Sequence, residues 1–98
     1  MARYLMLWEL DRSRIPADPK ERVAAWTALA NMVRQDLGAG QTESWGSFIG
    51  QMKGYCLVEG DEVDIGMMVQ KYAPYAYFQT FAVAGIETIE TILRQMAG

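Results

Sequence analysis

The chain has 98 residues with 12 acidic and 9 basic side chains, a formal net charge of −3, and no histidine. A hydrophobic share of 51% and a charged share of 21% are typical of one folded domain, and they exclude a disordered chain or a nucleic-acid partner held by bulk positive charge. The lack of histidine excludes the commonest general base, the usual proximal haem ligand and the HExxH zinc helix.

The single cysteine, Cys56, cannot form a disulfide within the chain, and without histidine it cannot complete a tetrahedral zinc site. We expect a cytoplasmic location, because a lone free thiol is typical of a reducing compartment. The apolar stretch 4–8 is shorter than a signal-peptide core or a membrane span, and acidic residues follow it. We therefore expect no export signal and no membrane partner.

Residues 3–10 are short, aromatic and apolar, and a polar stretch with a proline follows them, so they predict a strand. A helix is expected to begin next, with Asp18 as N-cap, Pro19 at the first helical position and Glu21 completing a capping box. One face of this helix is apolar, which predicts that it packs by that face; the residues concerned are Trp26, Leu29, Ala30, Val33 and Leu37.

The helix is expected to end at Gly38 and Gly40, since glycine tolerates the left-handed conformation after a last turn. Two strands are predicted over 43–49 and 55–59, and the glycines that bound the turn 50–54 make them an antiparallel hairpin.

A second helix is predicted to follow Gly60 and Asp61, because apolar residues recur at helical spacing from Ile65. Pro74 prevents its continuation and leads into a last strand over 75–83. The remaining residues, 86–97, predict a C-terminal helix.

The predicted order is strand, helix, strand, strand, helix, strand, with one helix appended. We expect an α+β fold, a ferredoxin-like βαββαβ sandwich with both main helices on one face of an antiparallel sheet. The chain is expected to form a single domain over 1–98, with a core over 3–84 and the added C-terminal helix over 86–97.

The second face of this sheet has no predicted cover, although strand side chains on both faces are apolar. In the first strand one side carries Leu5 and Leu7, and the other carries Tyr4, Met6, Trp8 and Leu10. The last strand alternates in the same way, with Tyr75, Tyr77, Phe81 and Val83 against Ala76, Phe78 and Ala82. An uncovered apolar face of this size is unusual for a monomer, so we expect a homodimer with the two sheets packed face to face.

At this point the chain resembles the dimeric α/β-barrel superfamily, over roughly residues 3–84. The motifs that carry the resemblance are Trp45-Gly46, Gly54-Tyr55, Val58-Glu59-Gly60-Asp61 and the run from Phe78 to Val83, and they are similar to small domain-of-unknown-function members. The superfamily also contains antibiotic-biosynthesis-type monooxygenases, haem-degrading enzymes and isomerases. The resemblance implies that two copies form a dimeric α/β barrel.

The haem-degrading members have a pattern of Asn, Trp and His around the porphyrin. This chain has no histidine, and its only asparagine, Asn31, is predicted on the polar side of the first helix. We expect no haem, no other cofactor and no metal site. No catalytic residue of the monooxygenase members can be matched position by position.

Several residues are candidates for a pocket. Glu9 and Asp11 form a carboxylate pair that could share a proton, with a solvated strand end as the alternative. Arg12 and Arg14 precede a helix N-terminus and are candidate anion contacts, or simply surface charges. Aromatic side chains could line a site for a flat organic ligand, or serve as core and dimer interface; those singled out are Trp8, Trp45, Tyr55, Tyr75 and Tyr77.

The expected function is that of a small homodimeric α/β-barrel protein that binds a small organic molecule or has a regulatory role. The alternative is a cofactor-independent enzyme of the monooxygenase or isomerase kind, acting on an aromatic or polyketide-like substrate. A third possibility is a peptide-binding module that uses an unpaired edge at 43–49. An enclosed cavity of at least about 300 Å³ that receives Glu9, Asp11 or a tyrosine hydroxyl would favour the enzyme, whereas a cavity filled by aromatic rings would favour the first.

Overall fold

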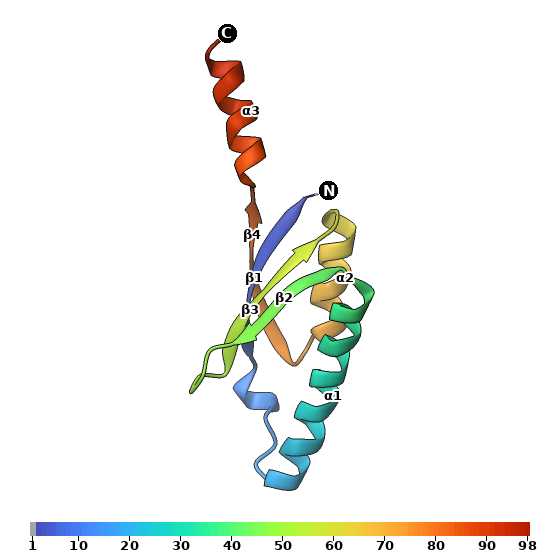
Figure 1. Ribbon diagram of the computed structural model, residues 1–98. Coiled ribbons are helices and arrows are strands. Elements are labelled where there is room, and N and C mark those ends of the chain that lie inside the picture. Colours follow the sequence, from blue (N-terminus) through green and yellow to red (C-terminus); the bar gives the residue numbers. More distant parts are fainter. Residues whose placement is uncertain (1) are drawn as a thin grey trace.

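The computed structural model describes residues 2–98. Its elements in chain order are β1 (Arg3–Leu10), a short 3₁₀ helix η1 (Arg12–Arg14), α1 (Pro19–Ala39), β2 (Thr42–Ser47), β3 (Lys53–Glu59), α2 (Glu62–Tyr72), β4 (Ala76–Val83) and α3 (Ile86–Met96) (Figure 1). The predicted α+β class is confirmed, as are the antiparallel sheet and the three α-helices.

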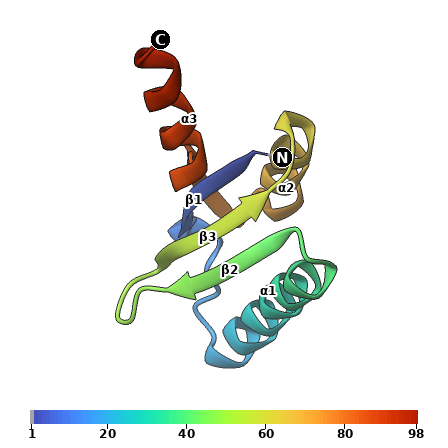
Figure 2. The ribbon, with the colours of Figure 1, turned by 45° about the horizontal axis from the view of Figure 1, so that its top comes forward.

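The four strands form one antiparallel sheet in the order β2-β3-β1-β4. β1 is central: Met6 lies opposite Cys56 of β3 on one side and Thr80 of β4 on the other. α1 and α2 lie on the same side of the sheet, whereas α3 projects beyond the end of β4 (Figure 2). This order and connection pattern are compatible with a ferredoxin-like arrangement.

The helix ends follow the capping residues. The Asp18 side chain accepts a hydrogen bond from the Glu21 amide at 3.3 Å, and Pro19 is the first helical residue of α1. The helix continues through Gly38 and ends where Gly40 adopts a left-handed φ of 84°. At α2, Asp61 and Asp64 each accept a hydrogen bond from the other's amide, which forms a reciprocal capping box.

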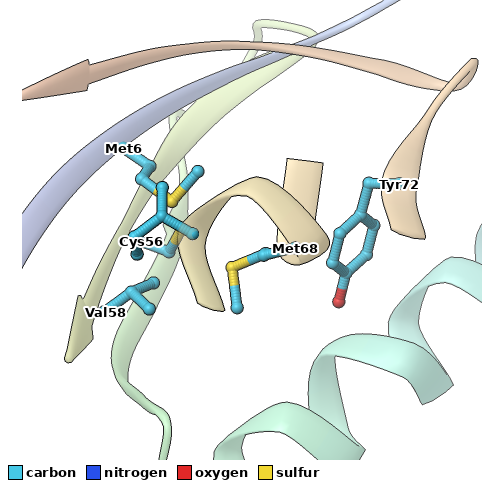
Figure 3. Close-up of a cluster of buried hydrophobic side chains, with 6 residues drawn as sticks. Met6, Cys56, Val58, Met68 and Tyr72 are labelled. Carbon is cyan, nitrogen blue, oxygen red and sulfur yellow. The ribbon is translucent and has the colours of Figure 1, made fainter. Parts of the chain in front are cut away.

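The hydrophobic core lies between α2 and the face of the sheet that the helices cover, here called the inner face. It contains Met6, Cys56 and Val58 from the sheet and Ile65, Met68 and Tyr72 from α2 (Figure 3). α1 contributes only partly buried side chains, among them Leu29 and Val33. The tightest packing is therefore under α2, and α1 is held less closely.

Two glycines make room for aromatic rings on opposite faces of the sheet. Gly54 lies opposite Trp8 in the β1–β3 register, and a Cβ there would collide with the Trp8 indole and with the Gly46 carbonyl oxygen. Gly46 lies opposite Tyr55 in the β2–β3 register, and a Cβ there would collide with the Tyr55 ring. Each ring thus lies over backbone that has no side chain, which covers the glycine from water.

The other face of the sheet, here called the outer face, has no helix over it (Figure 2). Its centre is formed by half-buried Leu5, Leu7, Tyr55 and Leu57 together with Tyr77, Phe81 and Val83 of β4. Tyr77 is 62% exposed and Phe81 is 50% exposed. Charged residues lie at the margins, including an ion pair between Arg3 and Glu43 at 3.1 Å.

The hairpin differs from the prediction at the end of its first strand. β2 stops at Ser47 instead of extending to Ile49, because the chain turns once Phe48 has donated its amide to the Lys53 carbonyl at 2.9 Å. Gly50 supplies the left-handed residue of this turn with a φ of 84°. Ile49 consequently lies at the tip and is 95% exposed.

We expect Gly54→Ala to lower the free energy of unfolding by about 2 kcal/mol, because the added methyl group forces either Trp8 or the β2 backbone to move. The matched control is Gly66→Ala in α2, where a Cβ meets nothing within 4 Å. That change should raise stability by about 0.5–1 kcal/mol through helix propensity. Urea denaturation of both variants measures the difference, and equal effects would contradict the packing described here.

Candidate functional site

A cavity of about 540 Å³ lies between α1 and the inner face of the sheet. Four parts of the chain form its walls: α1, the sheet, α2 and the turn between β2 and β3. Most of the lining is apolar, with the principal contributions from Trp26, Leu29 and Val33 of α1, Trp8, Trp45 and Phe78 of the sheet, Met68 and Tyr72 of α2, and Met52 of the turn. The cavity exists because α1 is not packed against the sheet as closely as α2 is.

A pair of stacked indoles forms part of the sheet wall. The ring centroids of Trp8 and Trp45 are 5.4 Å apart and their planes differ by 9°. Gly54 allows Trp8 to lie against the sheet, and Trp45 then covers Trp8 from the β2 side. The Trp8 Nε1 is buried and has no hydrogen-bond partner among residues 2–98. An unpaired buried N–H costs about 1–3 kcal/mol, so this atom is a local weakness of the wall rather than a group that faces the open space of the cavity.

The polar end of the cavity is formed by Asp36 of α1. Its carboxylate accepts a hydrogen bond from the Tyr72 hydroxyl at 2.6 Å and forms an ion pair with the Lys71 ammonium. Figure 3 shows the Tyr72 hydroxyl directed from α2 toward α1. Asp36 is buried whereas Lys71 is partly exposed, so the ammonium neutralises the buried charge from the solvent side. These contacts join α1 to α2 at one end of the cavity.

Two further groups at this end hold their protons more tightly than usual. Burial raises the pKa of Tyr72 well above its ordinary value, and the hydrogen bond to Asp36 adds to the effect. Burial also raises the pKa of Cys56 to about 11, with a smaller contribution from the negative charge of Asp36. The Cys56 thiol is therefore protonated at neutral pH and is a poor nucleophile.

The residues proposed from sequence as a pocket lie in different parts of the structure. Trp8 and Trp45 line the cavity under α1. Glu9, Tyr55 and Tyr77 project from the outer face, as their positions in the strand register require. Glu9 and Tyr77 contribute to a separate hollow of about 440 Å³ on that face, which also includes Leu7, Phe48 and Lys53.

Asp11 lies just after β1 and has a structural role there. Its carboxylate caps η1 by accepting hydrogen bonds from the Ser13 amide at 3.0 Å and the Ser13 hydroxyl at 2.7 Å. It also accepts one from the Tyr77 hydroxyl at 3.1 Å. The contacts with Ser13, followed by that with Tyr77, lower the pKa of Asp11, and the same carboxylate raises the pKa of Tyr77.

The remaining candidates lie close to this corner. The Tyr75 carbonyl accepts a hydrogen bond from the Asp11 amide at 2.8 Å, and its ring is 47% exposed in the connection between α2 and β4. Arg12 and Arg14 are exposed in η1. Asp11, Tyr75, Arg12 and Arg14 all lie outside the lining of the cavity under α1.

Sequence reasoning missed the polar end of the cavity. Asp36 lies within the apolar stripe of α1, three residues after Val33 and seven after Leu29, and this position was the available signal. A charged residue within an apolar stripe requires a partner, and Tyr72 occupies the matching place at the end of the stripe of α2. Which two helices meet there depends on tertiary packing.

No family model and no curated protein matches the chain. Across residues 2–98, no group of three or more His, Cys, Asp or Glu side chains is arranged to hold a metal ion. None of the helices formed by these residues has the length and apolarity needed to cross a membrane.

We expect the free energy of unfolding to fall as the pH rises from about 9 to 11. Over this range the thiol of Cys56 ionises in the unfolded chain but stays protonated in the folded one, so the unfolded state binds fewer protons. Urea denaturation at several pH values should give a slope that is steeper, by up to about 1 kcal/mol per pH unit, in the wild type than in Cys56→Ala. Parallel slopes would contradict the buried, protonated thiol.

Proposed function

We propose that the protein binds a small, flat organic molecule in the cavity between α1 and the sheet, and that it does so as a homodimeric α/β barrel. The cavity is the observation that carries the binding proposal. Its volume of about 540 Å³ is within the range of small-molecule sites, and its walls are apolar with a few polar groups, which is the usual composition of such sites.

The lining supports a particular ligand chemistry. The stacked Trp8 and Trp45 favour a planar, apolar molecule. The Asp36 carboxylate already has the Tyr72 hydroxyl and the Lys71 ammonium as partners. Because the Lys71 ammonium compensates the charge of this carboxylate, no free charge is left at this end of the cavity to pair with a charged ligand, so the ligand we propose is uncharged.

The outer face supports the homodimer. Packing the outer faces of two copies together would bury Leu5, Leu7 and Leu57, together with the exposed rings of Tyr77 and Phe81. Two sheets that pack in this way form the two-layered barrel that the resemblance to the dimeric α/β-barrel superfamily implies. The cavity lies on the other side of each sheet, so every protomer keeps its own binding site.

A cofactor-independent monooxygenase or isomerase is the second candidate. Two observations favour it. The cavity is larger than the volume of about 300 Å³ set as the criterion from the sequence and has a tyrosine hydroxyl, that of Tyr72, at its wall; and the hydrogen bond between Tyr72 and the buried Asp36 can orient a polar substrate. Against it, the pKa of Tyr72 is raised, which makes the hydroxyl a weak acid at neutral pH, and Glu9 projects away from this cavity. Binding without chemistry is therefore the better supported function.

One observation supports the peptide-binding alternative, because β2 is an edge strand of the sheet and a peptide could pair with it.

Titration with the neutral fluorescent probe N-phenyl-1-naphthylamine tests the cavity. Val33→Phe places a ring inside it and should weaken binding at least about tenfold, since it removes space that the probe needs. The matched control is Val23→Phe on the same helix, where the side chain is 64% exposed and does not line the cavity. Equal affinities in the wild type and both variants would contradict binding at this place.

Light scattering at micromolar concentration tests the dimer. The wild type should have the mass of two chains, and Phe81→Glu should reduce it to one, because the charge would be buried opposite the partner's apolar face. Thr80→Glu is the control, since it adds the same charge to the adjacent exposed residue on the inner side of β4. A wild-type mass near that of one chain would reject the homodimer.

A further inference from the structure

The C-terminal helix α3 is not packed on its own domain. None of its residues is buried, and it extends from the end of β4 away from the rest of the molecule (Figure 1). The chain consequently measures 62 Å along its longest axis but only 25 and 19 Å along the other two. Only Ala84 and Gly85 connect β4 to this helix.

The helix is strongly two-sided. At 100° per residue its apolar side chains fall on one side, and all of them are exposed; these form the α3 stripe, which consists of Ile86, Ile89, Ile92, Leu93 and Met96. Polar residues occupy the opposite side, where the Thr91 hydroxyl donates a hydrogen bond to the Glu87 carbonyl at 2.9 Å. An isolated helix of 11 residues is marginal in water, so α3 requires a surface that covers its stripe.

We propose that the α3 stripe packs against a second copy of the chain and extends the same interface as the outer face of the sheet. This proposal rests on the homodimer of the proposed function. It adds α3 as a second element of the dimer interface. α3 begins three residues after Val83, which is on the outer face, so the stripe starts close in the chain to the edge of that face. A helix of 11 residues is about 16 Å long, so the stripe lengthens the apolar surface by that distance beyond the end of β4 (Figure 1).

The apolar area also suits a second copy. At their exposed fractions of 62% and 50%, the rings of Tyr77 and Phe81 leave on the order of 200 Å² uncovered. The α3 stripe, with side chains exposed by 42–77%, adds on the order of 500 Å². A stable interface buries roughly 800 Å² per partner, a little over half of it apolar. The sheet face and the α3 stripe together provide that apolar area.

The charges favour a like copy over a membrane or a nucleic acid. The polar side of α3 carries Glu87 and Glu90 with a single Arg94, whereas helices that lie on anionic membranes are rich in Lys and Arg. The margins of the outer face are of mixed sign, with Lys53 beside Glu9 in the strand register and Arg3 paired with Glu43. A surface of mixed sign with an apolar centre accepts a second copy of itself without a net repulsion.

The decisive variant is Ile89→Glu/Met96→Glu, which places two charges in the middle of the stripe. Sedimentation equilibrium should show a dimer dissociation constant that rises on the order of 100-fold. The control is Thr88→Glu/Gln95→Glu, which adds the same charges at the same spacing on the polar side and should leave the constant within about threefold of wild type. Truncation after Ala84 removes the helix entirely and should weaken the dimer at least as much as the stripe variant.

Hydrogen exchange of α3, followed by mass spectrometry, distinguishes the partner from the helix's own domain. If the stripe packs on a second copy, amide protection in α3 should be present above the dissociation constant and lost on dilution below it. Protection that does not change with concentration would mean that α3 folds back on its own sheet, which overturns the proposal. A dimer whose dissociation constant is the same in the stripe variant also overturns it, but leaves the sheet interface intact.

A wild-type chain that is monomeric at every concentration overturns both the α3 contact and the dimer. In that case the probe titration still decides ligand binding separately, because Val33 is on the opposite side of the sheet from the outer face. A monomer that cosediments with neutral phosphatidylcholine vesicles only when α3 is present would assign the stripe to a lipid surface and would equally overturn the proposal.

Discussion

The central strand β1 carries large apolar side chains on both of its sides, and the arrangement of the rest of the molecule follows from this. On the inner side Met6 is fully buried under α2 and Trp8 lies over Gly54. On the outer side Leu5 and Leu7 are only half-buried, with neighbouring β-strands beside them and no helix above. The hydrophobic effect acts equally on the two faces. A chain that covers only one face therefore lacks the free energy that burial of the apolar side chains on the other face would contribute.

The inner face shows how covering can still leave space. α2 brings Ile65 and Met68 into direct contact with the sheet, and its capping box fixes where the helix begins. α1 instead approaches a surface raised by the Trp8 and Trp45 indoles, and it is joined to α2 through Asp36 at only one end. α1 is thus held to α2 at the Asp36 end, and the cavity lies between α1 and the indoles of the sheet wall.

Much of the fold could be predicted from the sequence because its signals are local. Asp18 with Pro19 marks the start of α1, and strand periodicity distinguishes β1 and β4 from the helices. The resulting order of elements leaves few ways to arrange the sheet, and the observed strand order is compatible with the ferredoxin-like arrangement that was expected. The early end of β2 was not predicted, because Phe48 and Ile49 have strand-like side chains, and side-chain pattern does not show where the hydrogen bond from the Phe48 amide to the Lys53 carbonyl closes the turn.

The candidate site was less predictable because it depends on which elements meet. Sequence patterning placed Trp8 and Tyr77 in one group of aromatic candidates, yet the strand register puts them on opposite faces of the sheet. Asp36 and Tyr72 are 36 positions apart in the chain, and no local pattern indicates that their side chains touch. Alternation along a strand predicts the side on which a residue lies, but not whether a helix on that side is packed closely or leaves a cavity.

The residues that line the cavity and the residues of the surface proposed for the partner lie on opposite faces of the sheet. The cavity is lined from the inner side, and the surface proposed for the partner lies on the outer side and along α3. Because successive residues of one strand point to opposite faces, Thr80 and Phe81 differ by one position yet belong to different surfaces. A substitution at either residue therefore changes one surface and leaves the other in place. This separation means that the proposed ligand binding and the proposed association can each be tested without disturbing the other, because different faces of the sheet carry the residues of each.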